Sequence, residues 1–311
     1  MKLQTKKIQW IEGTPLGISV YSARSLSTQI HENLLEIIMC VRGSIKFSYA
    51  YEEFTLRKGE FISADRDAYY LDDGQDSICV SFYIDLTAFY EKYPTTRNSM
   101  FACEGLEETE SNYPTAAHLE LQGLLLGLLI YLNEAEEPDR KIINRATDKI
   151  VRLMVENFDI LFFLAPKEQM SEKYIKRYNE MSVFLWERLY EPVTLKDLAD
   201  EFHLTESYIS EFIRKSGLSF KKMIAYHRAN ASEKLLLTTD KSIAAVAEMC
   251  GFSDVKPYYE AFKRWYKCTP KQFREKYKYG IKDDLDYVGL HTIEEDVKRI
   301  SMETHKRKLF L

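Results

Sequence analysis

The spacing of apolar side chains changes its period once along the chain. Between roughly residues 17 and 86 apolar and polar positions alternate, most strictly at Ile78, Val80, Phe82 and Ile84. This is the two-residue period of a strand. From about residue 115 the apolar positions follow a helical spacing instead. We therefore expect an α+β protein with several domains, in which an N-terminal sheet is followed by helices.

The N-terminal pattern predicts a small β-barrel or jelly roll. An apolar run over 35–41 is closed by Gly43-Ser44, alternation resumes over 45–49, and Lys58-Gly59 predicts a turn before Phe61. Short alternating segments separated by turn residues are typical of these two folds.

Three segments with a helical repeat follow, at 119–132, 141–158 and 172–189. We interpret them as a helical linker region. The leucine-rich first helix either packs on its own barrel or also forms a dimer interface, and its apolar run is too short and too interrupted to span a bilayer. No apolar run follows the lysines at the N-terminus, so we expect no signal peptide and a cytoplasmic protein.

A helix-turn-helix pattern occurs twice between Leu195 and Arg274, and the helical stretch 220–238 joins the two copies. Each copy has a short apolar helix with a small residue, a position suited to positive φ four residues later, and then an N-cap. In the first and second copy these positions are Ala199 and Ala247, His203 and Gly251, and Thr205 and either Ser253 or Asp254. A second helix held in this way is the element that enters a DNA major groove.

The apolar stripes of the two second helices predict which side chains face DNA. Ile209 and Phe212 point inward from a helix over 206–215, and Tyr258, Phe262 and Trp265 from a helix over 254–266. Outward side chains and nearby cations are then expected to read bases or bind phosphates. These residues are Ser207, Ser210, Glu211, Arg214, Lys215, Val255, Lys256, Tyr259, Glu260, Lys263, Arg264, Lys267 and Lys271.

Composition and charge agree with such a protein. The net charge of the 311 residues is −5, but residues 195–278 carry 12 Lys and 4 Arg against 11 Asp and Glu, which leaves +5 there and −10 elsewhere. A basic module on an acidic body is the asymmetry expected when one part of a protein meets phosphate. Five scattered cysteines predict reduced thiols and no zinc site.

The C-terminal region resembles the AraC family of bacterial transcription regulators. The resemblance rests on about ninety residues, among them Leu198-Ala199, Ser207–Ser210, Gly217, Ser219-Phe220, Arg228, Leu235-Leu236, Ile243, Ala247, Gly251–Asp254, Phe262-Lys263, Thr269-Pro270 and Phe273-Arg274. It implies a DNA-binding region of two helix-turn-helix units joined by one helix. The chain departs from the family at His203 and Lys267, where glycine is usual, at Glu206, where proline is common, and before Gly217, where the loop is one residue short.

Two further departures are glutamates at positions where the family commonly has arginine. Glu211 lies four residues before Lys215 and Glu260 four before Arg264, so each can form an intrahelical ion pair. Alternatively, each accepts a hydrogen bond from a cytosine or repels wrong sequences.

The barrel looks like the cupin sensor domain that precedes many AraC-type DNA-binding regions. A sugar-like effector would then bind inside it, and aromatic and polar residues are the candidates for that pocket. They are His31, Glu36, Arg42, Tyr49, Tyr70 and Phe82, with Tyr69 beside them. Tyrosine and phenylalanine on barrel strands are, however, usually core residues. One barrel histidine and one glutamate cannot supply the three ligands of a catalytic metal, so we expect no metal, no cofactor and no enzyme.

We predict a domain order of barrel (1–114), helical linker and dimerisation region (115–178), AraC-type DNA-binding domain (179–279) and charged extension (280–311). The extension carries Ile293, Val297 and Ile300 at helical spacing and either docks on the DNA-binding domain or stays mobile. Expected partners are double-stranded DNA, a second copy of the chain, a small effector and RNA polymerase, with no membrane. The alternative function is a DNA-binding regulator without an effector, whose barrel serves dimerisation or protein contact.

Overall fold

The computed structural model describes residues 7–29, 33–49, 52–64, 69–97, 101, 103–105, 114–159, 171–214, 219–279 and 282–308. The chain divides into two compact units, one made of residues 160–281 and the other of 2–159 together with 282–311. The expected α+β class, with an N-terminal barrel followed by a helical region, is confirmed.

The larger unit is built on an eight-stranded, mainly antiparallel sheet. Its path runs β1-β2-β6-β3-β5-β7, with β4 paired to β3 and β8 to β2. The strands are β1 (Gln9–Trp10), β2 (Leu16–Gln29), β3 (Leu34–Tyr49), β4 (Glu52–Arg57), β5 (Phe61–Ala64), β6 (Tyr69–Asp85), β7 (Glu104–Gly105) and β8 (Asp284–Tyr287). Two short 3-10 helices, η1 (Leu86–Phe89) and η2 (Pro94–Arg97), follow β6.

β3 differs from the sequence prediction in its length. Gly43-Ser44 does not close the strand, because β3 runs through both residues to Tyr49. Gly43 has φ 69° and lies where the pairing of β3 with β6 shifts register, so it accommodates a bulge. The turn predicted at Lys58-Gly59 is present between β4 and β5, with Gly59 at φ 86°.

The two faces of the sheet bury different side chains. Along β3, Leu35, Ile37 and Met39 belong to an apolar cluster shared with helices, which we call the helix-facing cluster. Ile38 and Cys40 belong to a second cluster made from strand residues, which we call the strand cluster. The strict two-residue alternation of a strand produces this division.

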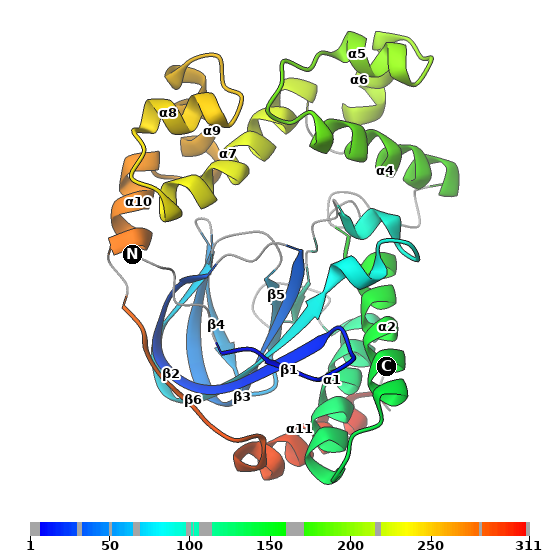
Figure 1. Cartoon of the computed structure of the whole chain (residues 1–311), viewed down its shortest axis with the longest axis vertical. Helices are drawn as coiled ribbons and strands as arrows, with labels where there is room; N and C mark the ends of the chain where they lie inside the picture. The colour runs from blue at the N-terminus through cyan, green and yellow to red at the C-terminus, as the bar shows by residue number, and fades with distance from the viewer. Residues whose placement is uncertain are drawn as a thin grey trace. The chain divides into compact units, whose positions relative to one another are not determined.

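Three helices supply the other side of the helix-facing cluster (Figure 1): α1 (Ala116–Glu134), α2 (Arg140–Asn157) and α11 (Glu294–Lys308), the last preceded by the 3-10 helix η4 (Leu290–Ile293). By length and composition α1 meets the criteria for a membrane-crossing helix, contrary to our expectation that it is too short. In the structure Leu121, Leu125 and Leu128 of α1 are buried in the helix-facing cluster. The helix therefore serves as a core helix of this unit.

In its described residues the smaller unit is all-helical. Its described elements are α4 (Glu172–Glu187), α5 (Leu195–Glu201), α6 (Glu206–Arg214), α7 (Phe220–Thr238), α8 (Ile243–Met249), α9 (Val255–Tyr266) and α10 (Pro270–Tyr279). The two expected helix-turn-helix motifs are α5–α6 and α8–α9, and α7 is the helix that joins them.

The C-terminal extension has neither of the two positions that the sequence suggested. It forms β8, η4 and α11, which belong to the barrel unit and not to the smaller, helical unit. The helical spacing of Ile293, Val297 and Ile300 is confirmed, since all three are buried in the helix-facing cluster.

Candidate DNA-binding surface

Local hydrogen bonds hold the first motif at the start of α5 and on both sides of the turn between α5 and α6. Thr194 and Asp197 form a capping box at the start of α5, and the hydrogen bonds from Thr194 lower the pKa of Asp197. His203 has the predicted positive φ, 52°, and the amide of Leu204 donates to the carbonyl of Ala199 at 2.9 Å. These contacts satisfy carbonyl groups left open at the end of α5.

The hydroxyl oxygen of Thr205 then accepts from the amide of Tyr208 at 3.2 Å and so caps the start of α6, as predicted.

The second motif repeats this arrangement 48 residues later. Ser242 caps α8, Gly251 has φ 78°, and the amide of Phe252 donates to the carbonyl of Ala247 at 3.0 Å. Asp254 is the N-cap of α9, which decides between the two residues that the sequence left open. The turn bonds and the caps of α5 and α8 recur 48 residues apart and identify a structural repeat, while the cap of α9 lies one residue later than that of α6.

Gly251 is also required for a steric reason. A Cβ atom there would lie 2.8 Å from the carbonyl oxygen of Tyr190 and 3.0 Å from Nε of Arg228. That guanidinium donates from Nε to the carbonyl of Leu189 at 2.8 Å, and burial lowers its pKa. Three parts of the unit therefore pack directly against one another: the backbone at Leu189 and Tyr190, helix α7, and the turn of the second motif.

α6 buries Ile209 and Phe212, as expected, together with Ile213. The four described candidates on this helix, Ser207, Ser210, Glu211 and Arg214, are all exposed. Lys215 lies outside the described residues, as does the Glu211–Lys215 pair that depends on it.

α9 buries Tyr258 and Phe262, as expected, but its third large buried residue is Tyr266. Trp265 is half-buried beside Tyr226, with 4.7 Å between ring centroids, so its predicted place in the buried stripe is wrong. The error arises because the 3.6-residue period puts position 266 as close to the stripe as position 265.

The candidate contact residues of α9 keep a solvent-facing side. Lys256, Glu260, Lys263 and Arg264 are exposed, while Val255 and Tyr259 are half-buried. Among the described residues no ion pair or hydrogen bond joins Glu260 to Arg264, so the structure does not contain the intrahelical pair that the spacing allows.

Two cations after α9 have partners of their own. Lys267 is the left-handed C-cap of α9 at φ 53°, and its ammonium donates to the carbonyl of Arg264 at 2.9 Å. The ammonium of Lys271 lies 3.9 Å from a carboxylate oxygen of Glu275. Both side chains are largely solvent-exposed, and exposed pairs of this kind exchange partners at little cost.

A buried polar seam fixes α9 on α7, and the sequence analysis did not predict it. The hydroxyl of Tyr258 donates to Oγ of Ser232 at 2.9 Å, and that of Tyr266 donates to the carboxylate of Glu233. Glu233 is only 2% exposed. Buried polar groups need such partners, so the seam specifies how the second recognition helix packs on the shared helix.

The four effector candidates whose side chains the structure describes do not converge on one pocket. Glu36 is fully buried on the face of the strand cluster, where the hydroxyl of Tyr69 donates to it at 2.5 Å. Phe82 lies in the helix-facing cluster, on the opposite side of the sheet. The Tyr70 hydroxyl donates to Glu53, outside both clusters. His31 and the side chain of Tyr49 lie outside the described residues.

Arg42 makes contacts that the sequence did not predict. Its guanidinium donates from Nε to the carboxylate of Asp296 at 2.9 Å and from Nη2 to the carbonyl of Thr292 at 3.0 Å. Both partners lie in the C-terminal segment. Arg42 therefore holds that segment on the sheet.

The residues that surround Glu36 include two tyrosines that we did not single out. Burial and the neighbouring Glu36 raise the pKa of Tyr83, and burial raises that of Tyr21, whose hydroxyl lies 3.0 Å from Oγ of Ser81. The alternation of 79, 81 and 83 with the apolar positions 80, 82 and 84 is the pattern that predicts such an opposite face. Among the described residues no group of three or more His, Cys, Asp or Glu side chains is arranged to hold a metal ion.

Comparison with known proteins agrees with this architecture. A family model described as a helix-turn-helix domain matches residues 198–276. The HTH-type transcriptional activator FapR of Escherichia coli is 27% identical over 136 residues, which are 41% of this chain and 51% of that protein. The melibiose operon regulatory protein of Escherichia coli K12 is 28% identical over 152 residues, which are 46% of this chain and 50% of that protein.

Similar solved structures include ToxT from Vibrio cholerae, at 13% identity and a TM-score of 0.44, covering 84% of this chain and 98% of that one. The chain spans about half the length of the curated relatives it matches. The segment from residue 198 to 276 belongs to the DNA-binding helix-turn-helix domains of the AraC type.

Proposed function

We propose that the chain is a sequence-specific transcription regulator whose two recognition helices, α6 and α9, enter successive major grooves. The observation that carries this proposal is the repeat of α5–α6 and α8–α9 on one shared helix, with matching turns and with polar, exposed outer faces. Two such helices on one unit would read grooves about 34 Å apart on one side of the duplex. The expected site is asymmetric within each protomer.

Base selection from a random-sequence duplex library by the full chain tests this function. We expect an enriched site with two conserved blocks about one helical turn apart, and a footprint that protects both major grooves. A library that yields no enriched sequence, or a single protected groove, would contradict the proposal.

Arg214 on α6 and Lys263 on α9 are the exposed cations best suited to separate the two contacts. Arg214→Ala and Lys263→Ala should each weaken binding by about 1–3 kcal/mol if they read a base, with relaxed specificity in one block only. If they contact phosphate instead, each change should weaken binding to all sequences alike. The slope of log affinity against log salt concentration should then fall in magnitude by about one. The exposed Lys173 of α4 provides the control, since Lys173→Ala should leave both measurements unchanged.

Glu260 is proposed to take part in sequence selection, because its exposed carboxylate has no intrahelical partner in the described chain. Carboxylates accept from the amino group of cytosine in the major groove. Glu260→Gln should alter the preferred base at one position of the α9 block. Glu211→Gln is the matched change on α6. If the Glu260→Gln variant selects the same site as the unaltered chain, Glu260 does not read a base.

The finer part of the proposal is a small polar, sugar-like effector bound on the face of the strand cluster. Glu36 and Tyr69 support it, since a buried carboxylate with a tyrosine hydroxyl offers hydrogen bonds to ligand hydroxyls. One relative is named as a regulator of a melibiose operon. A thermal-shift screen of sugars should find a ligand that stabilises the full chain and loses its effect in Glu36→Gln.

The second candidate function is a regulator without an effector, in which the barrel unit mediates dimerisation or contact with RNA polymerase. The filled strand cluster favours it, because its strand side chains pack against one another. Sedimentation of the full chain with and without DNA measures self-association. A sugar that changes both the melting temperature and the DNA affinity would favour the first candidate. DNA affinity that no screened sugar changes would favour the second.

A further inference from the structure

The DNA-binding unit is connected to the barrel unit at both of its ends. Residues 2–159 form most of the barrel unit, residues 160–281 form the DNA-binding unit, and the chain then returns to the barrel unit with residues 282–311. Eleven residues, 160–170, separate Asp159 from the start of the described helical unit. Only two, 280 and 281, separate Tyr279 at the end of α10 from Lys282.

The returning segment pairs with the sheet. β8 runs antiparallel to β2, with Tyr287 opposite Tyr21 and Leu285 opposite Ala23. The hydroxyl of Ser25 donates to the carbonyl of Lys282 at 2.6 Å. The connection to the barrel unit therefore begins immediately after residue 281.

Further polar contacts flank this pairing. The amide of Ser27 donates to a carboxylate oxygen of Asp283 at 2.7 Å, and Arg24 forms an ion pair with Asp284. The amide of Val288 donates to the carbonyl of Val20 at 3.0 Å. Contacts therefore extend along the whole paired length of β8.

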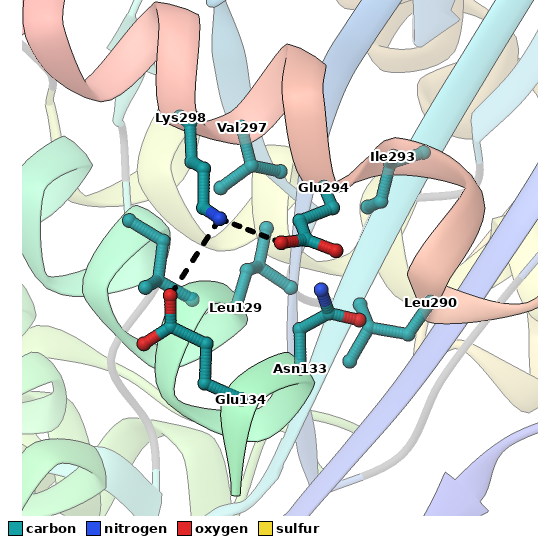
Figure 2. A pocket seen from close by; sticks show the side chains of 9 residues that line it. Leu129, Asn133, Glu134, Leu290, Ile293, Glu294, Val297 and Lys298 are labelled. Carbon is teal, nitrogen blue, oxygen red and sulfur yellow. Dashed lines mark hydrogen bonds and ion pairs between the residues drawn. The ribbon is translucent and has the colours of Figure 1, made fainter.

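α11 completes the helix-facing cluster and is fixed to the sheet by the guanidinium of Arg42. Val297 and Ile300 are each 2% exposed, and Asp296 is the residue that accepts from Arg42. Lys298 adds a second polar contact, because its ammonium lies 2.6 Å from Glu294 and 3.7 Å from Glu134 of α1 (Figure 2). A shallow pocket lined by residues of α1, η4 and α11 lies beside this pair.

A buried chain of hydrogen bonds also links α11 to the turn between β4 and β5. The hydroxyl of Thr304 donates to Oε1 of Gln122 at 2.7 Å, and Nε2 of Gln122 donates to the carbonyl of Gly59 at 2.6 Å. Thr304 and Gln122 are 5% and 6% exposed. Loss of either partner would leave a buried polar group unsatisfied. The position of α11 is therefore fixed by polar contacts as well as by apolar packing.

β8 is also in contact with the residues around Glu36. The ring of Tyr287 packs edge-on against that of Tyr21, with centroids 6.5 Å apart. Tyr21 belongs to the strand cluster, and the charge of Glu36 is among the causes that raise its pKa. Tyr21 thus joins the strand cluster to β8.

We propose that residues 282–308 are a second tether through which the barrel unit and the DNA-binding unit influence each other. The inference rests on the DNA-reading function proposed above. Only two residues separate α10 from Lys282, so changes in β2 and β8 are passed to the DNA-binding unit along this connection, whereas eleven residues separate the units at 160–170. Because coupling between two sites is reciprocal, DNA binding must in turn change the stability of the β2–β8 pairing.

Hydrogen exchange of the full chain, with and without a duplex selected from the random library, measures this coupling. We expect the duplex to change the exchange rates of the β8 amides by about fivefold or more. A flexible Gly/Ser insertion between Ile281 and Lys282 should abolish the change while leaving DNA binding in place. The same insertion between Ala165 and Pro166 is the matched control, and the change should persist there.

Asp296→Asn provides an independent variant that alters neither connection. It weakens the contact of Arg42 with α11 and should raise the exchange rates of β8 while reducing their response to DNA. Equal responses in the two insertion variants, or a β8 segment that does not respond to the selected duplex in the unaltered chain, would overturn the tether. Failure of the library selection would instead overturn the DNA-reading function itself.

Discussion

In the first helix-turn-helix unit α6 is held by Ile209, Phe212 and Ile213, whereas in the second α9 is held by aromatic rings and by hydroxyls that bond to α7. The backbone turns match, with the same capping bond between Leu204 and Ala199 and between Phe252 and Ala247. The comparison teaches that a local turn can be repeated without repeating its packing. Specific packing should make the second unit the more rigid one.

The largest expected difference concerns the central phenylalanine of each recognition helix. Phe262 is fully buried against the rings of Tyr258, Tyr266 and Phe273, while Phe212 is 5% exposed and contacts Tyr174 and Tyr208. Phe262→Ala should destabilise the DNA-binding unit by about 3–5 kcal/mol, and Phe212→Ala should lie at the lower end of that range. Calorimetry of the full chain measures both. A greater loss in Phe212→Ala would reverse the comparison.

The two turns should also respond differently to alanine. Gly251→Ala places a Cβ 2.8 Å from a backbone oxygen at positive φ, which should cost about 1–3 kcal/mol. His203→Ala keeps a non-glycine residue in the same backbone region at an exposed position, so the change should stay within about 0.5 kcal/mol. Thermal unfolding of both variants measures the difference. Equal effects would show that the close approach at Gly251 is unimportant.

The buried hydroxyls of the second unit predict a smaller effect. Tyr258→Phe removes the hydrogen bond to Ser232 and should cost about 1 kcal/mol. In the first unit, the hydroxyl of Tyr174 donates to the carbonyl of Phe212 at 3.4 Å from a half-buried position. Tyr174→Phe should therefore cost less, about 0.5 kcal/mol. Urea denaturation followed by fluorescence measures both, and a larger cost for Tyr174→Phe would contradict the proposed rigidity of the second unit.

The smallest effect is expected at the left-handed end of α9. Lys267 has φ 53°, so Lys267→Gly should relieve the backbone cost, offset in part by the greater freedom of glycine in the unfolded chain. The net stabilisation should be below about 1 kcal/mol. Lys271→Gly, within α10, is the control and should destabilise by up to about 1 kcal/mol. Destabilisation by Lys267→Gly would show that the hydrogen bond of its ammonium outweighs the strain.

Local features of the sequence were sufficient to predict the DNA-binding unit. Positive φ at His203 and Gly251, the cap at Thr205, and the buried faces of both recognition helices depend on neighbours a few residues away, while the cap of α9 was narrowed to Ser253 or Asp254. The exception is the third aromatic of α9, because adjacent positions 265 and 266 differ little in helical phase. The proposed DNA contacts remain predictions.

The barrel was predicted less completely, since its strands pair residues distant in sequence. Alternation located the strands, but it did not tell which face Glu36 and Phe82 occupy. The alternation of β3 passes through a bulge at Gly43, which the sequence suggested as an end. Arg42, a plausible pocket residue by type, lies on Asp296, 254 residues away.

The sequence by itself determined the repeated helix-turn-helix motifs, because turn geometry and helix capping are set by residues within one or two turns. Only the tertiary structure decided the place of the C-terminal segment. The helical spacing of its apolar residues predicts an apolar face, but it does not predict which part of the molecule packs against that face. Pairing with β2, the guanidinium of Arg42 and the buried link from Thr304 to Gly59 decide that, and each joins residues more than 180 positions apart.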